Sequence, residues 1–213
     1  MASPNFDELH ARLSRQVEDP VTAASVTAGT DTPQILLTAV RSDYLNRATR
    51  EFLQAAYLII GKEKMRKIFQ AMLTSQAIAD FLAAGVAITS YLELPIDLVM
   101  TGNTSKFIFW PNKSELDNFQ NPHLTASYAI EGTKLYAYLN GTILGTGDGA
   151  GTFYHIGYTD LTANAASDTA LPKLFWDTVV DYAVSFFLAE TGKADELRAN
   201  RIQLALKTLS SMG

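Results

Sequence analysis

The apolar residues of this chain change their spacing twice, and this change limits the folds that it can adopt. Between residues 33 and 83 they recur every three or four positions, which is the period of an amphipathic α-helix. From Val86 they alternate, and from Leu171 the helical spacing returns. Alternation predicts strands with one buried face. The sequence therefore predicts an α+β fold, in which a helical bundle carries an inserted antiparallel β-meander.

The inserted strands are predicted most clearly in residues 122–158. Residues 122–130 and 133–139 are alternating runs, and Glu131-Gly132 between them indicates a hairpin. A glycine-rich loop, residues 141–151, leads to a third run at 152–158. Further elements are predicted ahead of the hairpin: strands at 86–94 and 107–110 and a short helix at 112–119.

Three long helices are predicted for the bundle, at residues 34–60, 63–83 and 171–190. The first begins at Asp31-Thr32-Pro33, a capping residue followed by proline, and Gly61 ends or interrupts it. Its apolar stripe contains Leu36, Val40, Tyr44, Ala48, Phe52, Ala55 and Ile59. Its opposite, solvent-facing side contains Arg41, Asp43, Arg47, Arg50 and Glu51. Gly192 is expected just after the last of the three helices.

The remaining segments are predicted to lie outside this bundle. Residues 1–32 form an N-terminal arm with a short helix before Asp19-Pro20 and an extended linker after it. The bundle takes 33–87 and 171–192, and the β-insert takes 88–160. Residues 193–213 form a C-terminal tail, an amphipathic segment with Ile202, Leu206 and Leu209 on one side.

Composition excludes several classes of function. The chain of 213 residues has no cysteine, which excludes disulfides, thiolate catalysis and cysteine metal sites. A net charge of −5 disfavours a dedicated nucleic-acid binder but suits a surface past which DNA slides without adhering. The longest apolar stretches are too short or too often charged to span a membrane, so no membrane association is expected.

No catalytic, cofactor-binding or metal-binding residue is predicted. The glycine loop lacks the Gly-Lys-Ser/Thr sequence and the following helix of a phosphate-binding loop. Asp177 and Asp181 lie one helical turn apart, but neither has a histidine at metal-binding spacing, so a solvated helix face is expected. The three histidines, His10, His123 and His155, fall on different elements.

Four groups of short stretches follow one another along residues 34–190. They are Arg41–Ala48; Tyr91–Asp97; Pro122, Tyr128–Gly132, Leu135-Tyr136 and Ile156–Tyr158; and Leu171-Pro172 with Phe175 and Asp177–Ala183. In this order they resemble the head–tail adaptor (head-completion or neck) proteins of tailed bacteriophages. The glycine loop at 141–151 is longer than the turn expected in that family.

The resemblance implies a structural virion protein without chemistry or cofactors. Such a protein forms a ring, commonly of twelve copies, beneath the portal in the virion neck, and it is assembled in the host cytoplasm. Its partners are further copies of itself, the portal, tail or neck components, and the passing DNA, which it does not read by sequence. The candidate subunit or partner interface comprises Arg41, Arg47, Arg50, Ile202, Leu206 and Leu209. In this view the tail orders on the portal ring, and the N-terminal arm is the alternative for that role.

Two other classes of function remain open at this stage. One is a carbohydrate- or peptide-binding β module with a site among the aromatic residues Trp110, Tyr128, Tyr136, Tyr138 and Tyr158. Aromatic residues at strand spacing are more often part of a core. The other is an enzyme that uses the carboxylates of Asp177 and Asp181.

Overall fold

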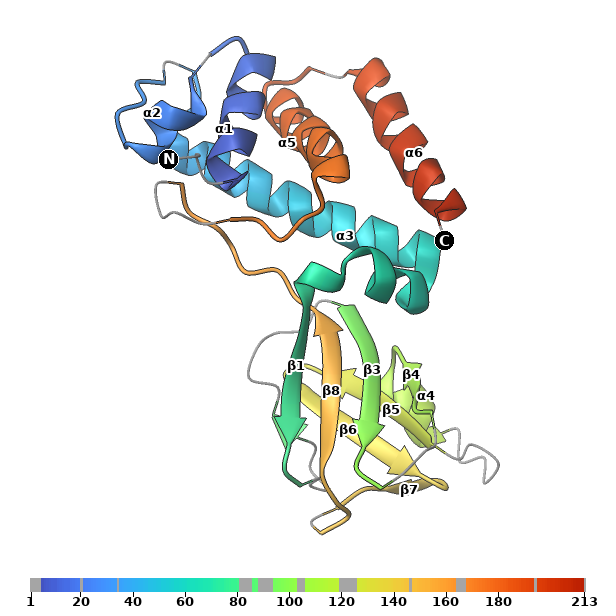
Figure 1. The fold of residues 1–213 in the computed structure, drawn as a ribbon. Coiled ribbons are helices and arrows are strands. Elements are labelled where there is room, and N and C mark those ends of the chain that lie inside the picture. Colours follow the sequence, from blue (N-terminus) through green and yellow to red (C-terminus); the bar gives the residue numbers. More distant parts are fainter. Residues whose placement is uncertain are drawn as a thin grey trace. The chain divides into compact units, whose positions relative to one another are not determined.

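In the computed structural model the chain forms two compact units (Figure 1). The structure describes residues 5–19, 21–33, 35–80, 86–87, 94–102, 106–118, 126–145, 147–163, 168–193 and 195–212. One unit, Met1–Ala71 with Tyr158–Gly213, is helical, and the other, Met72–Gly157, contains the strands. The α+β class is confirmed, and the β unit is inserted into the helical one.

The helical unit is built around two helices, α3 (Thr38–Ile68) and α5 (Trp176–Glu190). A short 3-10 turn, η2 (Lys173–Phe175), precedes α5, and Gly192 follows it with a left-handed φ of 72°. On one side of α5 lies α1 (Asn5–Gln16), and on the other lies α6 (Glu196–Ser211), as Figure 1 shows. Both outer helices also pack on α3.

Three aromatic rings form the centre of this unit. Phe52 on α3 is fully buried, and its ring centroid lies 6.1 Å from that of Phe69 and 5.2 Å from that of Phe175. Phe69 and Phe175 stack at 5.3 Å. Aromatic pairs at these separations add to the stabilisation that burial alone provides. The expectation that Phe52 faces the core is therefore confirmed.

Helix α3 departs from the prediction at both ends. It begins at Thr38, because Asp31 does not cap it but instead bonds Arg41 and the Thr38 hydroxyl. Gly61 has a non-helical backbone that kinks the helix, as its position suggested. The helix predicted over 63–83 ends at Ile68, and the prediction is wrong for residues 69–80, because residues 73–78 form a strand. Residues 81–83 lie outside the described residues.

The predicted N-terminal arm is also corrected. Helix α1 buries Phe6, Leu9 and Leu13 against the bundle, so it belongs to the core of the unit. The supposed linker contains a second short helix, α2 (Ala23–Thr27). Thr22 and Ser25 form a reciprocal capping box at its start, a pattern that stabilises a helix N-terminus.

The β unit contains two sheets where the sequence predicted one meander. The first is antiparallel, in the order β1 (Leu73–Ile78), β8 (Gly151–Ile156), β3 (Leu94–Met100). The second has the order β2 (Val86–Ala87), β6 (Lys134–Leu139), β5 (Ala126–Glu131), β4 (Ile108–Trp110), and β7 (Thr142–Ile143) pairs with β6. The 3-10 turn η1 (Gln70–Met72) precedes β1, and helix α4 (Lys113–Asn118) lies between β4 and β5.

The hairpin at Glu131-Gly132 is confirmed, and Gly132 supplies the left-handed φ of 59° that its turn needs. The prediction is wrong for the third strand of the meander, residues 152–158. This segment forms β8, which does not pair with β6 but with β1 and β3. Strand β4 runs parallel to β5. One apolar core joins both sheets, with Leu98 and Phe153 from the first and Tyr128 and Leu135 from the second. Residues 88–93 and 122–125 of the predicted strands lie outside the described residues.

The aromatic centre generates a prediction about α3. Phe52→Ala should lower the free energy of unfolding by about 3–5 kcal/mol, because a cavity remains where the ring packed. Leu58→Ala, on the same helix but 84% exposed, should cost less than about 0.5 kcal/mol. Chemical denaturation of both variants measures the difference. Equal losses would show that the buried face of α3 is assigned wrongly.

Candidate functional site

Arg41, which was predicted on a solvated interface, is instead fully buried. Its guanidinium pairs with Asp31, and it donates to the Thr38 hydroxyl at 3.1 Å and to His10 Nδ1 at 3.4 Å. Burying a charge is tolerated when it is paired and hydrogen-bonded in this way. The expectation that Arg41 contacts a partner is corrected: it joins α1, α3 and the segment before α3.

His10 lies inside the same network. Its Nδ1 accepts from Arg41, so the ring proton resides on Nε2, which donates to the Ser42 hydroxyl at 3.2 Å. The ring of Phe6 packs edge-on against it at 4.9 Å. Burial, and then the positive charge of Arg41, lower the pKa of His10 to about 3. The imidazole is therefore neutral, and it serves as an acceptor within the core.

Arg47 and Arg50 remain at the surface. The Arg47 guanidinium lies over the ring of Phe186, 4.1 Å from its centroid, and Arg50 pairs with Asp160. Both side chains keep exposed atoms, so their role in a subunit interface stays a prediction.

The C-terminal segment is not a free tail. Asp195 caps α6 by accepting from the Arg198 backbone N–H at 3.1 Å, and the helix packs on α3 and α5. Ile202, Leu206 and Leu209 are buried in this contact. Their amphipathic pattern correctly showed which face is covered. The expectation that a partner covers it is wrong, because the chain itself does so.

The two aspartates of α5 have different surroundings. Asp177 is 84% exposed and pairs with Arg12 of α1. Asp181 is 8% exposed, and its Oδ1 accepts from Arg198 and from Arg201 of α6, each at 2.8 Å. Burial raises the pKa of Asp181, while the two guanidinium groups oppose this rise. The predicted solvated face therefore holds for Asp177 and is wrong for Asp181.

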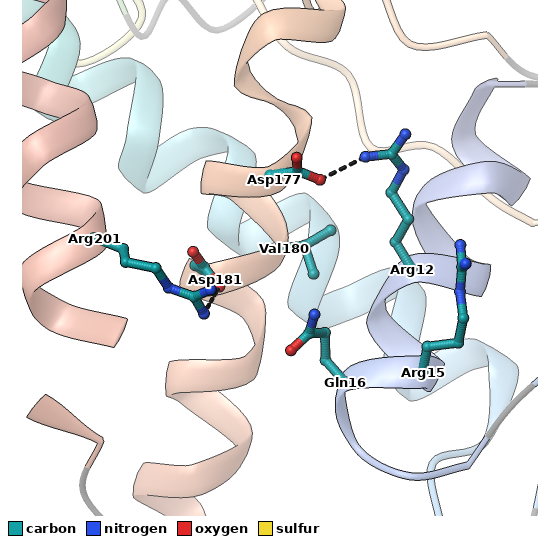
Figure 2. A pocket seen from close by; sticks show the side chains of 7 residues that line it. All are labelled: Arg12, Arg15, Gln16, Asp177, Val180, Asp181 and Arg201. Carbon is teal, nitrogen blue, oxygen red and sulfur yellow. Dashed lines mark hydrogen bonds and ion pairs between the residues drawn. The ribbon is translucent and has the colours of Figure 1, made fainter. Parts of the chain in front are cut away.

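These ion pairs border a cleft between α1 and α6 over α5, which Figure 2 shows. Its volume is about 510 Å³. We call it the arginine cleft, and it is lined by Arg12, Arg15, Gln16, Asp177, Val180, Asp181 and Arg201. Sequence reasoning missed it, because its cationic residues lie almost 190 positions apart. The four-residue spacing of Asp177 and Asp181 was the only signal.

An apolar groove lies beside the cleft, and Arg201 lines both. Its volume is about 290 Å³, and its other lining residues are Leu174, Phe175, Thr178, Leu204, Ala205, Thr208 and Met212. Leu174 and Leu204 are each 66% exposed. Large apolar side chains at this exposure, grouped in one place, indicate a contact surface.

The aromatic residues of the β unit do not form a common binding surface. Tyr128 is fully buried in the core, and the Tyr138 hydroxyl donates to Asp117 of α4. Trp110 and Tyr136 pack with Leu116 beneath the same helix. Tyr158 belongs to the helical unit and donates to Asn46 Oδ1 at 2.9 Å.

Two backbone N–H groups of the glycine loop donate to carboxylates of the chain. Gly147 N donates to Asp80 Oδ1 at 2.7 Å, and Gly145 N donates to Asp148. Negative groups at these amides oppose a phosphate, in agreement with the sequence argument. Among the described residues, His10 and His155 lie in different units, and no group of three or more His, Cys, Asp or Glu is arranged to hold a metal ion. His123 lies outside the described residues.

Within the described ranges, no helix combines the length and apolar character needed to cross a membrane. No known protein-family model matches the chain, and no curated protein sequence matches it either.

The buried imidazole predicts a pH dependence of stability. The pKa of His10 is lowered from 6.5 to about 3, so below pH 6.5 the unfolded chain binds a proton that the folded chain does not. The contribution of neutral His10 is complete above pH 6.5 and is lost as the pH falls toward 3. Between pH 6.5 and about pH 5 the loss should be about 2 kcal/mol. His10→Gln keeps an acceptor for Arg41 but has no group that titrates in this range. The unfolding free energy of this variant, measured by denaturant titration at several pH values, should therefore fall less steeply between pH 6.5 and pH 5. An equally steep fall would contradict the assignment.

The docking of α6 predicts the effect of removing it. Truncation after Gly192 exposes the apolar surface under Ile202, Leu206 and Leu209 and leaves the Asp181 carboxylate without both arginines. The helical unit should then lose about 5 kcal/mol or more of unfolding free energy. Truncation after Ser211 is the control and should leave the melting temperature unchanged. A fully stable chain without α6 would mean that the helix is not part of the folded unit.

Proposed function

We propose that this protein is a structural virion component, a head–tail adaptor that forms a ring beneath the portal of a tailed bacteriophage. In this role it lines part of the DNA channel and offers a platform to tail components. Its partners are neighbouring copies, the portal and the next neck or tail protein. The work it does is geometric and requires no cofactor.

The main support is the order of elements along the chain. A helical unit made from both ends of the chain carries a β unit inserted between residues 72 and 157. The resemblance to the adaptor family rests on short stretches in this same order, from Arg41–Ala48 on α3 to Asp177–Ala183 on α5. An agreement between the order of motifs and the order of elements is more specific than any single motif.

The apolar groove is the best candidate for a contact between copies. Rings arise when a surface on one subunit meets a different surface on the next one and the rotation closes. Leu58 and Ile59 of α3 are exposed apolar residues on the same helical unit, so they offer a second surface of matching character. The net charge of −5 suits a channel, because it removes the phosphate-driven attraction that would retain DNA.

The carbohydrate- or peptide-binding alternative on the β unit is less well supported. It requires Tyr128 and Tyr158 to share a surface with Trp110. Tyr128 is buried in the core, and Tyr158 belongs to the other unit.

Electron microscopy of particles tests the proposed function directly. Antibody raised against the purified chain should label the neck of the virus that encodes it, where the head meets the tail. Labelling of the capsid surface or the tail tip, or absence of the chain from particles, would refute the proposal.

A matched pair of variants tests the contact surface. Leu204→Asp places a charge in the apolar groove, whereas Gln203→Asp places the same charge on the neighbouring exposed position of α6. When the chain is mixed with the portal ring of the same virus, sedimentation should show that Leu204→Asp fails to form the adaptor ring. Gln203→Asp should assemble like the unmodified chain. Equal assembly by both variants would remove the groove from the interface.

A further inference from the structure

The arginine cleft contains hydrogen-bond donors that the chain leaves unused. Within the described residues, the side chain of Arg15 makes one hydrogen bond, from its Nε to the Ala11 carbonyl at 3.1 Å, and its two terminal nitrogens have no partner there. Gln16 accepts from Arg198 at 3.5 Å, and its amide nitrogen is likewise without a partner in the described chain. Figure 2 shows both side chains at the α1 wall of the cleft.

The opposite wall adds another cation. Arg201 uses one terminal nitrogen to bond Asp181, and its other nitrogens have no partner within the described ranges. The same oxygen of Asp181 also accepts from Arg198, so this carboxylate is shared between two arginines. The lining residues thus comprise three arginines and two aspartates, an excess of one positive charge.

We propose that the arginine cleft binds the carboxylate of an acidic side chain, glutamate in particular, from a peptide segment of a partner protein. The terminal nitrogens of Arg15 match the two oxygens of a carboxylate, and bidentate pairs of this type are among the stronger hydrogen bonds in proteins. The Gln16 amide supplies a further donor. Clusters of arginine are a common means of recognising acidic motifs.

Two features of the lining favour a peptide over nucleic acid. Asp177 is exposed at the cleft, and its charge repels a continuous row of phosphates while it tolerates one carboxylate bound to Arg15. Val180 is the one aliphatic residue in the lining, and it gives the methylene stem of a glutamate an apolar contact. A volume of about 510 Å³ accommodates such a side chain together with its backbone.

This inference does not depend on the adaptor function, since the cleft chemistry is the same whatever protein supplies the segment. The test uses the full-length chain and a short fluorescent peptide with two glutamates among alanine and serine residues. A second peptide replaces both glutamates with glutamine. Fluorescence anisotropy should show saturable binding of the glutamate peptide and none of the glutamine peptide.

A matched pair of variants locates the binding. Arg15→Gln should raise the dissociation constant about tenfold, because it removes the charge-assisted bidentate pair. Lys207→Gln removes the same charge from an exposed position of α6 outside the cleft, and it should change the constant by less than about twofold. The exposed Arg15 makes a single local bond, so its variant should keep the melting temperature of the unmodified chain.

Four outcomes would overturn the proposal. The first is the absence of saturable peptide binding up to about 1 mM peptide. The second is equal weakening by both variants, which indicates diffuse charge attraction, and the third is equal binding of the glutamine peptide. The fourth is binding of inorganic phosphate or a single-stranded oligonucleotide, but not of the peptide, that Arg15→Gln abolishes. The last result would identify the cleft as a phosphate site.

Discussion

The contact of Phe52 and Phe69 with Phe175 joins two parts of the chain that the β unit separates. Phe52 and Phe69 precede the insertion, and Phe175 follows it by almost twenty residues. A helical unit made from both ends of a chain needs such a contact, because residues 72–157 separate its two halves in the sequence. The three rings therefore connect the segment before the β unit to the segment after it within one helical core.

Around this apolar centre, buried ion pairs fix the outer helices. Arg41 holds His10 of α1 and Asp31 of the segment before α3, while Asp181 holds Arg198 and Arg201 of α6. The desolvation penalty of such pairs offsets much of their attraction, so their contribution to stability is modest. The loss of one partner, however, leaves an uncompensated buried charge. These pairs consequently determine how α1 and α6 are placed, and apolar packing supplies most of the stability.

The sequence predicted those features of the fold that depend on residues close to one another in the chain. Local signals worked: the helical spacing placed Phe52 in the core, and Gly132 and Gly192 marked a turn and a helix end where φ is positive. Pairing between distant segments was not visible. Residues 73–78 continue the apolar spacing of the preceding helix, yet they form β1 because β8 offers them a strand partner. In the same way, the pattern of Ile202, Leu206 and Leu209 identified a covered face but could not show that α3 and α5 cover it.

The same limit applies to the candidate surfaces. Arg41 was predicted to face solvent because a helical stripe has two sides, but α1 also packs on α3, and Arg41 is buried there. Val40 and Ile59, toward the two ends of the predicted apolar stripe, are instead exposed. The arginines that do reach a surface come from opposite ends of the chain. Arg12 and Arg15 stand one turn apart on α1, and Arg201 faces them from α6 across α5.

Packing α1 and α6 on either side of α5 has a consequence for recognition. Apolar residues of all three helices turn inward, so the charged residues at the edges of those faces meet over the exposed side of α5. These charged residues line the arginine cleft. The apolar groove between α5 and α6 lies next to it, and Arg201 lines both. A charged site and an apolar site therefore form one continuous surface on the helical unit. Leu204→Asp and Arg15→Gln act on separate parts of it, and for this reason assembly and carboxylate binding can be tested independently.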